Sequence, residues 1–170
     1  MTSPKGLWAA GVALASMVAA GPVTASVFLQ VDLPALTKMS GSVVHARVTD
    51  VRSAWNDDGT FIFTYVTLQV EETFRGEATD TVVVRVPGGR VGNYVAQMEG
   101  APTFEPDEEV VAFLARWDDG VPMIAGYFQG LSKVEHDALG NKTLRGGLAH
   151  GMPIAALARA VGPARGRRLR

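Results

Sequence analysis

The chain of 170 residues has 47% hydrophobic and 19% charged side chains, a composition typical of one folded domain and not of a disordered segment. It contains no cysteine, which excludes disulfide bonds, thiolate nucleophiles, cysteine-ligated zinc and iron–sulfur clusters. All 17 acidic residues fall within residues 26–158, against ten lysines and arginines, and this body of net charge −7 argues against a nucleic-acid partner.

Residues 1–25 have the pattern of a secretory signal peptide. Lys5 supplies the positive charge of the N-terminal region, and Leu7–Ala20 is an uncharged apolar run. Val23–Ala25 offers the small residues that a signal peptidase recognises. We therefore expect cleavage after Ala25, with a cut at the end of the apolar run as the second choice, and a secreted or periplasmic protein. The alternative is an uncleaved membrane anchor formed by residues 6–23, and only then would the membrane be a partner.

N-terminal sequencing of the exported protein is expected to begin at Ser26, because cleavage removes the residues before it. The measurement is made separately on protein from the periplasm, the medium and the membrane fraction. Recovery of intact Met1 in the membrane fraction would contradict cleavage and support the anchor.

Residues 26–161 are predicted to form a single domain that begins with a helix and continues as strands. Apolar residues at helical spacing predict a short helix over Asp32–Met39. Val43–Arg52 is rich in β-branched residues and predicts the first strand, which Asn56–Gly59 ends in a turn. The second strand, Phe61–Phe74, alternates between two faces, and the face expected to be buried carries Ile62, Thr64, Val66, Leu68 and Val70.

The second half of the domain is predicted as further strands and a final helix. Val110–Trp117 is the most apolar strand and is expected at the centre of the sheet, and Pro153–Val161 predicts the C-terminal helix. Residues 162–170 form an arginine-rich tail. The remaining expected elements, in chain order, are a strand at 81–86, an irregular segment at 90–107 with a short strand or turn near 94–98, and strands at 121–128 and 131–135.

Short strands, frequent turns and a terminal helix predict a mostly β fold. The predicted architecture is a five- to six-stranded OB-like Greek-key barrel with a short N-terminal and a C-terminal helix. A long first hairpin and an insertion before a late apolar strand favour this barrel over the alternative, a β-sandwich. Leu68, Val84 and Phe113 are expected in one buried barrel core, since each lies in the middle of an apolar strand.

Three segments carry a resemblance to a known family: Val43–Val51, Val66–Gly76 and Phe104–Leu114. They resemble signatures of exported bacterial proteins whose barrel is similar to the OB domains of tissue inhibitors of metalloproteinases and of netrin-like modules. The resemblance covers about Val43 to Phe128 and implies a domain that binds or inhibits a secreted or periplasmic protease. Two features depart from the family. Asp107 stands where the pattern usually has a glycine, and the N-terminal cysteine with which the animal inhibitors chelate the protease zinc is missing.

We predict no cofactor, no metal and no catalytic residue. The three histidines, His45, His136 and His150, are widely separated and lack the spacing of a metal site, and His45 is interpreted as a packed or surface histidine. Residues 87–92 resemble a phosphate-binding loop but lack its Gly-Lys-Ser/Thr. The chain also has no Gly-x-Ser-x-Gly elbow.

A row of aromatic residues and the loop after the third strand form the candidate binding site. The rings are expected on the second face of Phe61–Phe74, and the loop at 89–94 offers side-chain types common in interfaces. The alternative is that residues 90–107 fold over the rings and form a second small core. The candidate residues are Phe61, Phe63, Tyr65, Arg90, Asn93 and Tyr94.

The predicted function is an exported non-enzymatic binding module for a protein or peptide, with a secreted or periplasmic protease as the partner that the resemblance implies. One alternative is a hydrolase with an unrecognised site, which a polar pocket with perturbed pKa values would favour. The other is a structural, envelope-associated protein held by its signal segment or its arginine tail.

Overall fold

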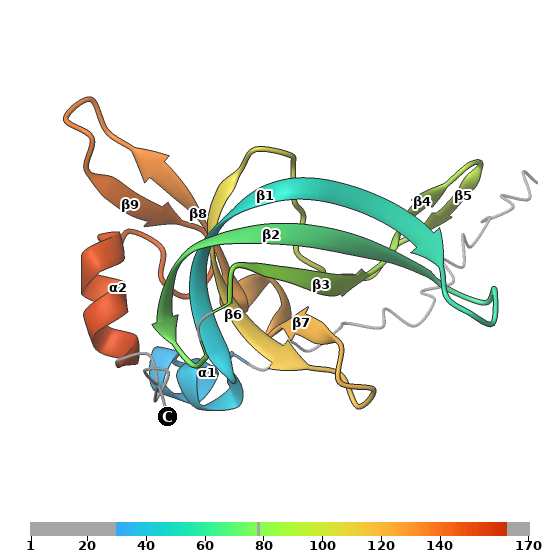
Figure 1. The fold of residues 1–170 in the computed structure, drawn as a ribbon, viewed down its shortest axis with the longest axis horizontal. Helices are drawn as coiled ribbons and strands as arrows, with labels where there is room; N and C mark the ends of the chain where they lie inside the picture. Colours follow the sequence, from blue (N-terminus) through green and yellow to red (C-terminus); the bar gives the residue numbers. More distant parts are fainter. Residues whose placement is uncertain (1–29, 78, 163–170) are drawn as a thin grey trace, which may run out of the picture.

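The structure is a computed structural model that describes residues 30–77 and 79–162, so the predicted signal peptide and the tail after Gly162 lie outside it. The described chain is mostly β with a helix near each end, as predicted (Figure 1). None of the helices in this part of the chain is long and apolar enough to cross a membrane. The elements are α1 (Leu33–Met39), β1 (Ser42–Trp55), β2 (Ile62–Arg75), β3 (Thr81–Pro87), β4 (Gly89–Val91), β5 (Tyr94–Ala96), β6 (Glu109–Arg116), β7 (Pro122–Ile124), the 3₁₀-helix η1 (Tyr127–Gly130), β8 (Leu131–His136), β9 (Lys142–Arg145) and α2 (Ile154–Val161).

One curved antiparallel sheet organises the domain, with strand order β3-β2-β1-β6-β8-β9 and β7 paired to β6. β1 is long enough to pair with two neighbours at once, so that Ala46 lies opposite Val70 on β2 and Val110 on β6. The sheet curls until β3 contacts β7, and there the Trp117 indole donates a hydrogen bond of 3.4 Å to the carbonyl oxygen of Arg85. The long β1–β2 hairpin and the β8–β9 hairpin project at opposite ends of this barrel-like sheet (Figure 1).

The buried side chains form two cores, one on each face of the β1–β6 pair. Side chains alternate across a strand, so neighbouring residues of β6 enter different cores. The first core lies inside the curved sheet and includes Leu68 and Val84, both fully buried. The second lies between the sheet and the two helices and includes Phe113. The prediction of one core for all three residues was therefore wrong for Phe113, although all three are buried.

β6 is buried on both faces, which explains why its sequence is a continuous apolar run. It is also the central strand that the sequence predicts, with β1, β7 and β8 as its neighbours. The chain differs from the prediction after the β6–β7 turn. Instead of a strand at 121–128, three residues pair with β6, and the chain then turns through left-handed conformations at Gly126 and Tyr127 (φ 65° and 56°) into η1. β9, which was not predicted from the sequence, pairs with the predicted strand β8 and brings the sheet to seven strands in the described residues, against the five or six expected.

The β4–β5 hairpin is fixed against the far half of the β1–β2 hairpin. Thr64 donates a hydrogen bond of 2.8 Å to the carbonyl oxygen of Gly88. A side chain at Gly89 (φ +142°) would place its Cβ 2.4 Å from the Ser53 hydroxyl oxygen and 2.5 Å from that of Thr64. Only glycine allows this close approach, which explains the glycine at position 89. The contact positions Tyr94 of β5 beside the end of β1.

Candidate functional site

The first candidate site is an exposed surface at the end of the β1–β2 hairpin. The rings of Trp55 and Tyr94 meet edge to face with centroids 5.4 Å apart, and Tyr94 is 66% exposed. Trp55 and the neighbouring Val95 are also exposed. Arg90 on β4 is the register partner of Val95 on β5, and Asn93 lies in the turn between the two strands. Side chains alternate along a strand, so Arg90 and Val95 lie on the face of the β4–β5 hairpin opposite to Tyr94. We name the exposed residues on both faces of this end, Trp55, Arg90, Asn93, Tyr94 and Val95, the hairpin-end surface.

The structure divides the six predicted site residues between two faces. Trp55 pairs in register with Ile62, so it shares the face of the hairpin that points into the barrel. Phe63 is the next residue along β2 and therefore points to the opposite face. Arg90, Asn93 and Tyr94 thus belong to the hairpin-end surface, whereas Phe61, Phe63 and Tyr65 do not.

The rings on the outer face are half-buried and partly covered. The Phe61 and Phe63 rings lie 5.0 Å apart, and the guanidinium of Arg85 lies between Phe63 and Trp117, at 5.0 Å and 5.4 Å from the two ring centroids. Arg85 is in turn paired with Asp119 at 2.7 Å. The cover therefore comes from β3 and the β6–β7 turn. The segment at 90–107 packs elsewhere, since its Phe104 contacts the first core.

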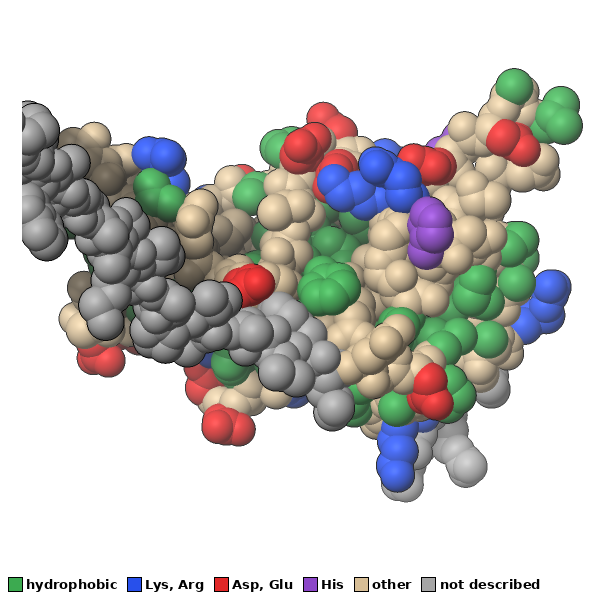
Figure 2. Space-filling view, turned by 180° about the vertical axis from the view of Figure 1, so that it is seen from behind, with side chains coloured by type: hydrophobic (Ala, Val, Ile, Leu, Met, Phe, Trp, Pro, Cys, Tyr) green, Lys and Arg blue, Asp and Glu red, His purple; other side chains and the backbone are tan. Residues whose placement is uncertain are grey.

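The second candidate site is a group of ionisable side chains around a carboxylate that the sequence analysis did not single out. The Glu109 side chain is only 7% exposed, and it lies where five strands approach one another at the base of the β8–β9 hairpin. Figure 2 shows acidic, basic and histidine side chains gathered near this hairpin. We name the group the Glu109 cluster; its members are His45, Arg47, Glu71, Glu109, His136 and Lys142.

Both oxygens of Glu109 are engaged. Oε1 lies 2.5 Å from Nε2 of His45 and 2.5 Å from Nζ of Lys142, and Oε2 lies 2.8 Å from Nε2 of His136. Burial raises the pKa of the Glu109 carboxyl, but the hydrogen bonds with Lys142, His136 and His45 outweigh it and lower the pKa to about 2. The group is therefore ionised at neutral pH. A carboxylate of such low pKa, with both oxygens in hydrogen bonds, is suited to holding cations and poorly suited to general acid or base catalysis.

Comparison with known proteins adds no name to either site. No protein-family model, no curated protein and no solved structure matches this chain. The resemblance to netrin-like and inhibitor OB domains therefore stays a prediction.

Proposed function

We propose that this domain is an exported, non-enzymatic binding module that holds a protein partner at the hairpin-end surface. The exposed Trp55–Tyr94 pair is the observation that supports the proposal most directly. Aromatic side chains offer a large contact area at a low cost in conformational entropy, and they dominate the binding energy of protein interfaces. Tyr94 exposes most of its surface, so its ring is accessible to a partner.

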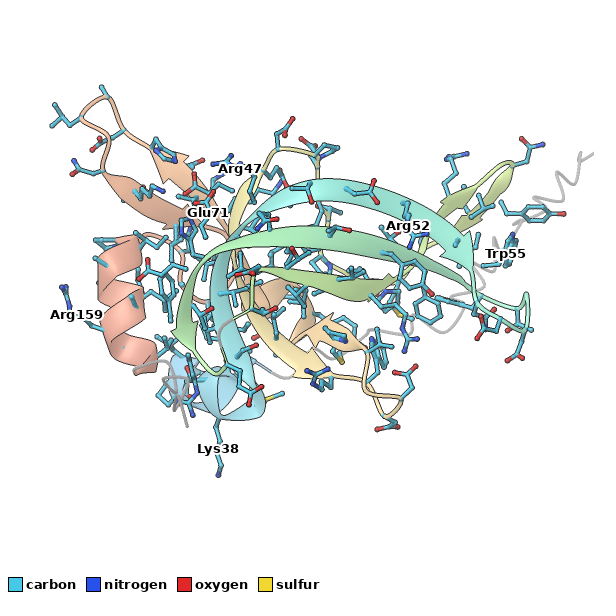
Figure 3. All side chains as sticks on the ribbon, viewed as in Figure 1. Lys38, Arg47, Arg52, Trp55, Glu71 and Arg159 are labelled. Carbon is cyan, nitrogen blue, oxygen red and sulfur yellow. The ribbon has the colours of Figure 1, made fainter. Side chains whose placement is uncertain are left out.

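The two rings are supported by paired strands. β4 and β5 pair with each other in regular register, and the Gly89 contact ties β4 to both strands of the long hairpin. Figure 3 shows Trp55 at this end of the molecule, far from Arg47 and Glu71 at the other end. A partner bound here would meet a preformed surface, which reduces the entropy lost on binding.

The chemistry of the surface favours a particular kind of partner segment. The two rings provide apolar contact on one face of β4–β5, and the exposed register pair Arg90 and Val95 lies on its other face. Arginine pairs with a carboxylate through two parallel hydrogen bonds. The complementary partner is a protein segment that contacts the rings with an apolar side chain and reaches Arg90, on the other face of the hairpin, with an acidic side chain. The secretory pattern of residues 1–25 supports a partner in the periplasm or the medium, and a protease is the class that the family resemblance suggests.

Replacing Arg90 and Tyr94 together by alanine is expected to abolish partner binding while changing the melting temperature by only a few degrees. Both side chains lie at the surface, and surface substitutions usually change the free energy of unfolding by about 0.5 kcal/mol or less. The measurement is capture of exported proteins by the immobilised domain that begins at Ser26, followed by assays of captured proteases for inhibition.

The matched control is Leu139→Ala, which removes the side chain that is 88% exposed at the tip of the other hairpin. This variant should capture the same partner as the unmodified domain. Equal capture by the double variant, or equal loss by the control, would show that the hairpin-end surface is not the binding site.

A further inference from the structure

Three potential ligand atoms of the Glu109 cluster converge from three strands. Nε2 of His45 on β1, a carboxylate oxygen of Glu71 on β2 and one of Glu109 on β6 all lie within 4.8 Å of one another. His45 and Glu109 are buried, and Glu71 closes the group on the solvent side. We propose that these side chains bind a divalent transition-metal cation of the zinc class, with His136 as the fourth ligand.

One of the ligand distances already matches a tetrahedral site, and a second requires a small movement. Zinc lies about 2.0–2.2 Å from imidazole nitrogen and carboxylate oxygen, so ligand atoms at the corners of the tetrahedron are about 3.3–3.6 Å apart. Nε2 of His45 already lies 3.5 Å from Oε2 of Glu71. Its 2.5 Å contact with Glu109 has to open by about 1 Å, a movement that rotation of the glutamate side chain supplies.

The fourth position has a donor within reach. Nε2 of His136 lies 2.8 Å from Oε2 of Glu109, and His136 is half-exposed on β8, so its ring has room to turn. Two neutral imidazoles and two carboxylates neutralise the charge of a divalent ion. They are also the nitrogen and oxygen ligands that zinc takes when cysteine is absent.

Arg47 orients the carboxylates for this role. Its Nη2 lies 3.2 Å from Oε1 of Glu71 and 3.6 Å from Oε2 of Glu109. The Glu71 contact leaves Oε2 of that residue turned toward His45. Hydrogen bonds that fix the orientation of a ligating carboxylate are a regular part of metal sites. Figure 3 shows Arg47 and Glu71 close together at the base of the β8–β9 hairpin.

Lys142 is the competitor of the metal ion. Its ammonium group lies 2.5 Å from the same Glu109 oxygen that faces His45, so it supplies a tethered positive charge at the proposed site. The Lys142 side chain is 33% exposed and can move into solvent, whereas His45 and Glu109 are buried. A divalent ion interacts more strongly with two carboxylates than one ammonium group does. Metal binding therefore displaces Lys142, and removal of this lysine should strengthen the binding.

The test is titration of the domain beginning at Ser26 with Co²⁺ and Zn²⁺, followed by calorimetry and by the visible absorption of tetrahedral cobalt. Lys142→Met is expected to bind at least about tenfold more tightly than the unmodified domain, because one positive charge near a divalent ion is removed. Glu71→Gln is expected to weaken binding about tenfold or more, since it removes a ligand on the exposed side of the site. Melting temperatures confirm that each variant is folded.

Lys133→Met is the matched control. Lys133 pairs with Glu108, the neighbour of Glu109, and its removal changes the net charge by the same amount without touching the proposed ligands. The control should bind the metal within a few-fold of the unmodified domain. If Lys142→Met shows no saturable binding, or if Lys133→Met gains as much affinity, the Glu109 cluster is an ion-pair network and not a metal site.

Discussion

Replacing Leu68 with alanine is expected to lower the free energy of unfolding by about 2–5 kcal/mol. Leu68 is fully buried in the first core, where it lies in register between Val48 on β1 and Val82 on β3. Truncation leaves a cavity in the middle of three paired strands, which hold the surrounding backbone in place and prevent collapse. Urea denaturation measures the change, and an unchanged slope of the transition shows that the folded state is intact.

The control for this prediction is Val83→Ala on the adjacent strand. Val83 is exposed on the outer face of β3, and its truncation should cost about 0.5 kcal/mol or less. Similar losses at positions 68 and 83 would contradict the assignment of the inner and outer faces.

The same experiment distinguishes the two cores. Phe113→Ala should cost about 3–5 kcal/mol, because Phe113 is buried in the second core. Leu68 and Phe113 pack on opposite faces of the sheet, so the losses of the two single variants should add within about 0.5 kcal/mol in the double variant. A coupling energy well above this value would mean that the two residues share one core.

Replacing Glu109 with glutamine is expected to lower the free energy of unfolding by about 3–5 kcal/mol at neutral pH. The substitution removes the negative charge that His45, His136 and Lys142 share in the described structure. The folded-state pKa of Glu109 is lowered from 4.5 to about 2. The group therefore contributes stability above the unfolded pKa of 4.5, and this contribution is lost as the pH falls toward 2.

The pH dependence gives a second measurement of the same prediction. Between pH 5 and pH 2, the unmodified domain should lose more stability than Glu109→Gln, whose side chain does not titrate in this range. Glu135→Gln is the control, since Glu135 pairs with Arg145 at an exposed position where an ion pair contributes about 0–1 kcal/mol. If Glu109→Gln keeps the neutral stability and the acid profile of the unmodified domain, Glu109 does not hold the five strands together.

Period-two alternation was enough to predict the strand around Phe61–Phe74 and its buried face, because the side-chain period of a strand is fixed by its backbone. The alternation could not predict that Phe63 and Tyr94 lie on different faces of the long hairpin. It depends on the path of the chain from Pro87 to Ala96, which returns β4 and β5 to the inner side of the long hairpin. Trp55 was missed for the same reason, since its ring partner comes from this returning segment.

The Glu109 cluster was not predicted because its members are far apart along the chain. His45 and Glu109 are separated by 64 residues, and each occupies a single position in an otherwise ordinary strand. Pairing of β1 with β6, which are neighbours in the sheet but far apart in the sequence, brings them together, and no local spacing encodes it. One local signal existed: Glu109 directly precedes the apolar run Val110–Leu114, and an acidic side chain at the start of a buried strand requires a partner.

Photocrosslinking at the hairpin-end surface tests the proposed binding function most directly. A photoreactive side chain is placed at Tyr94 in one variant and at Leu139 in another, and each is expressed in the exporting cell. We predict one dominant adduct at position 94 and none at position 139. Excess unmodified domain should suppress the adduct by competing for the partner, whereas excess Arg90→Ala/Tyr94→Ala domain should leave its yield unchanged. An adduct of equal yield at both positions, or none at position 94, would contradict the proposal that this domain binds a partner through the hairpin-end surface.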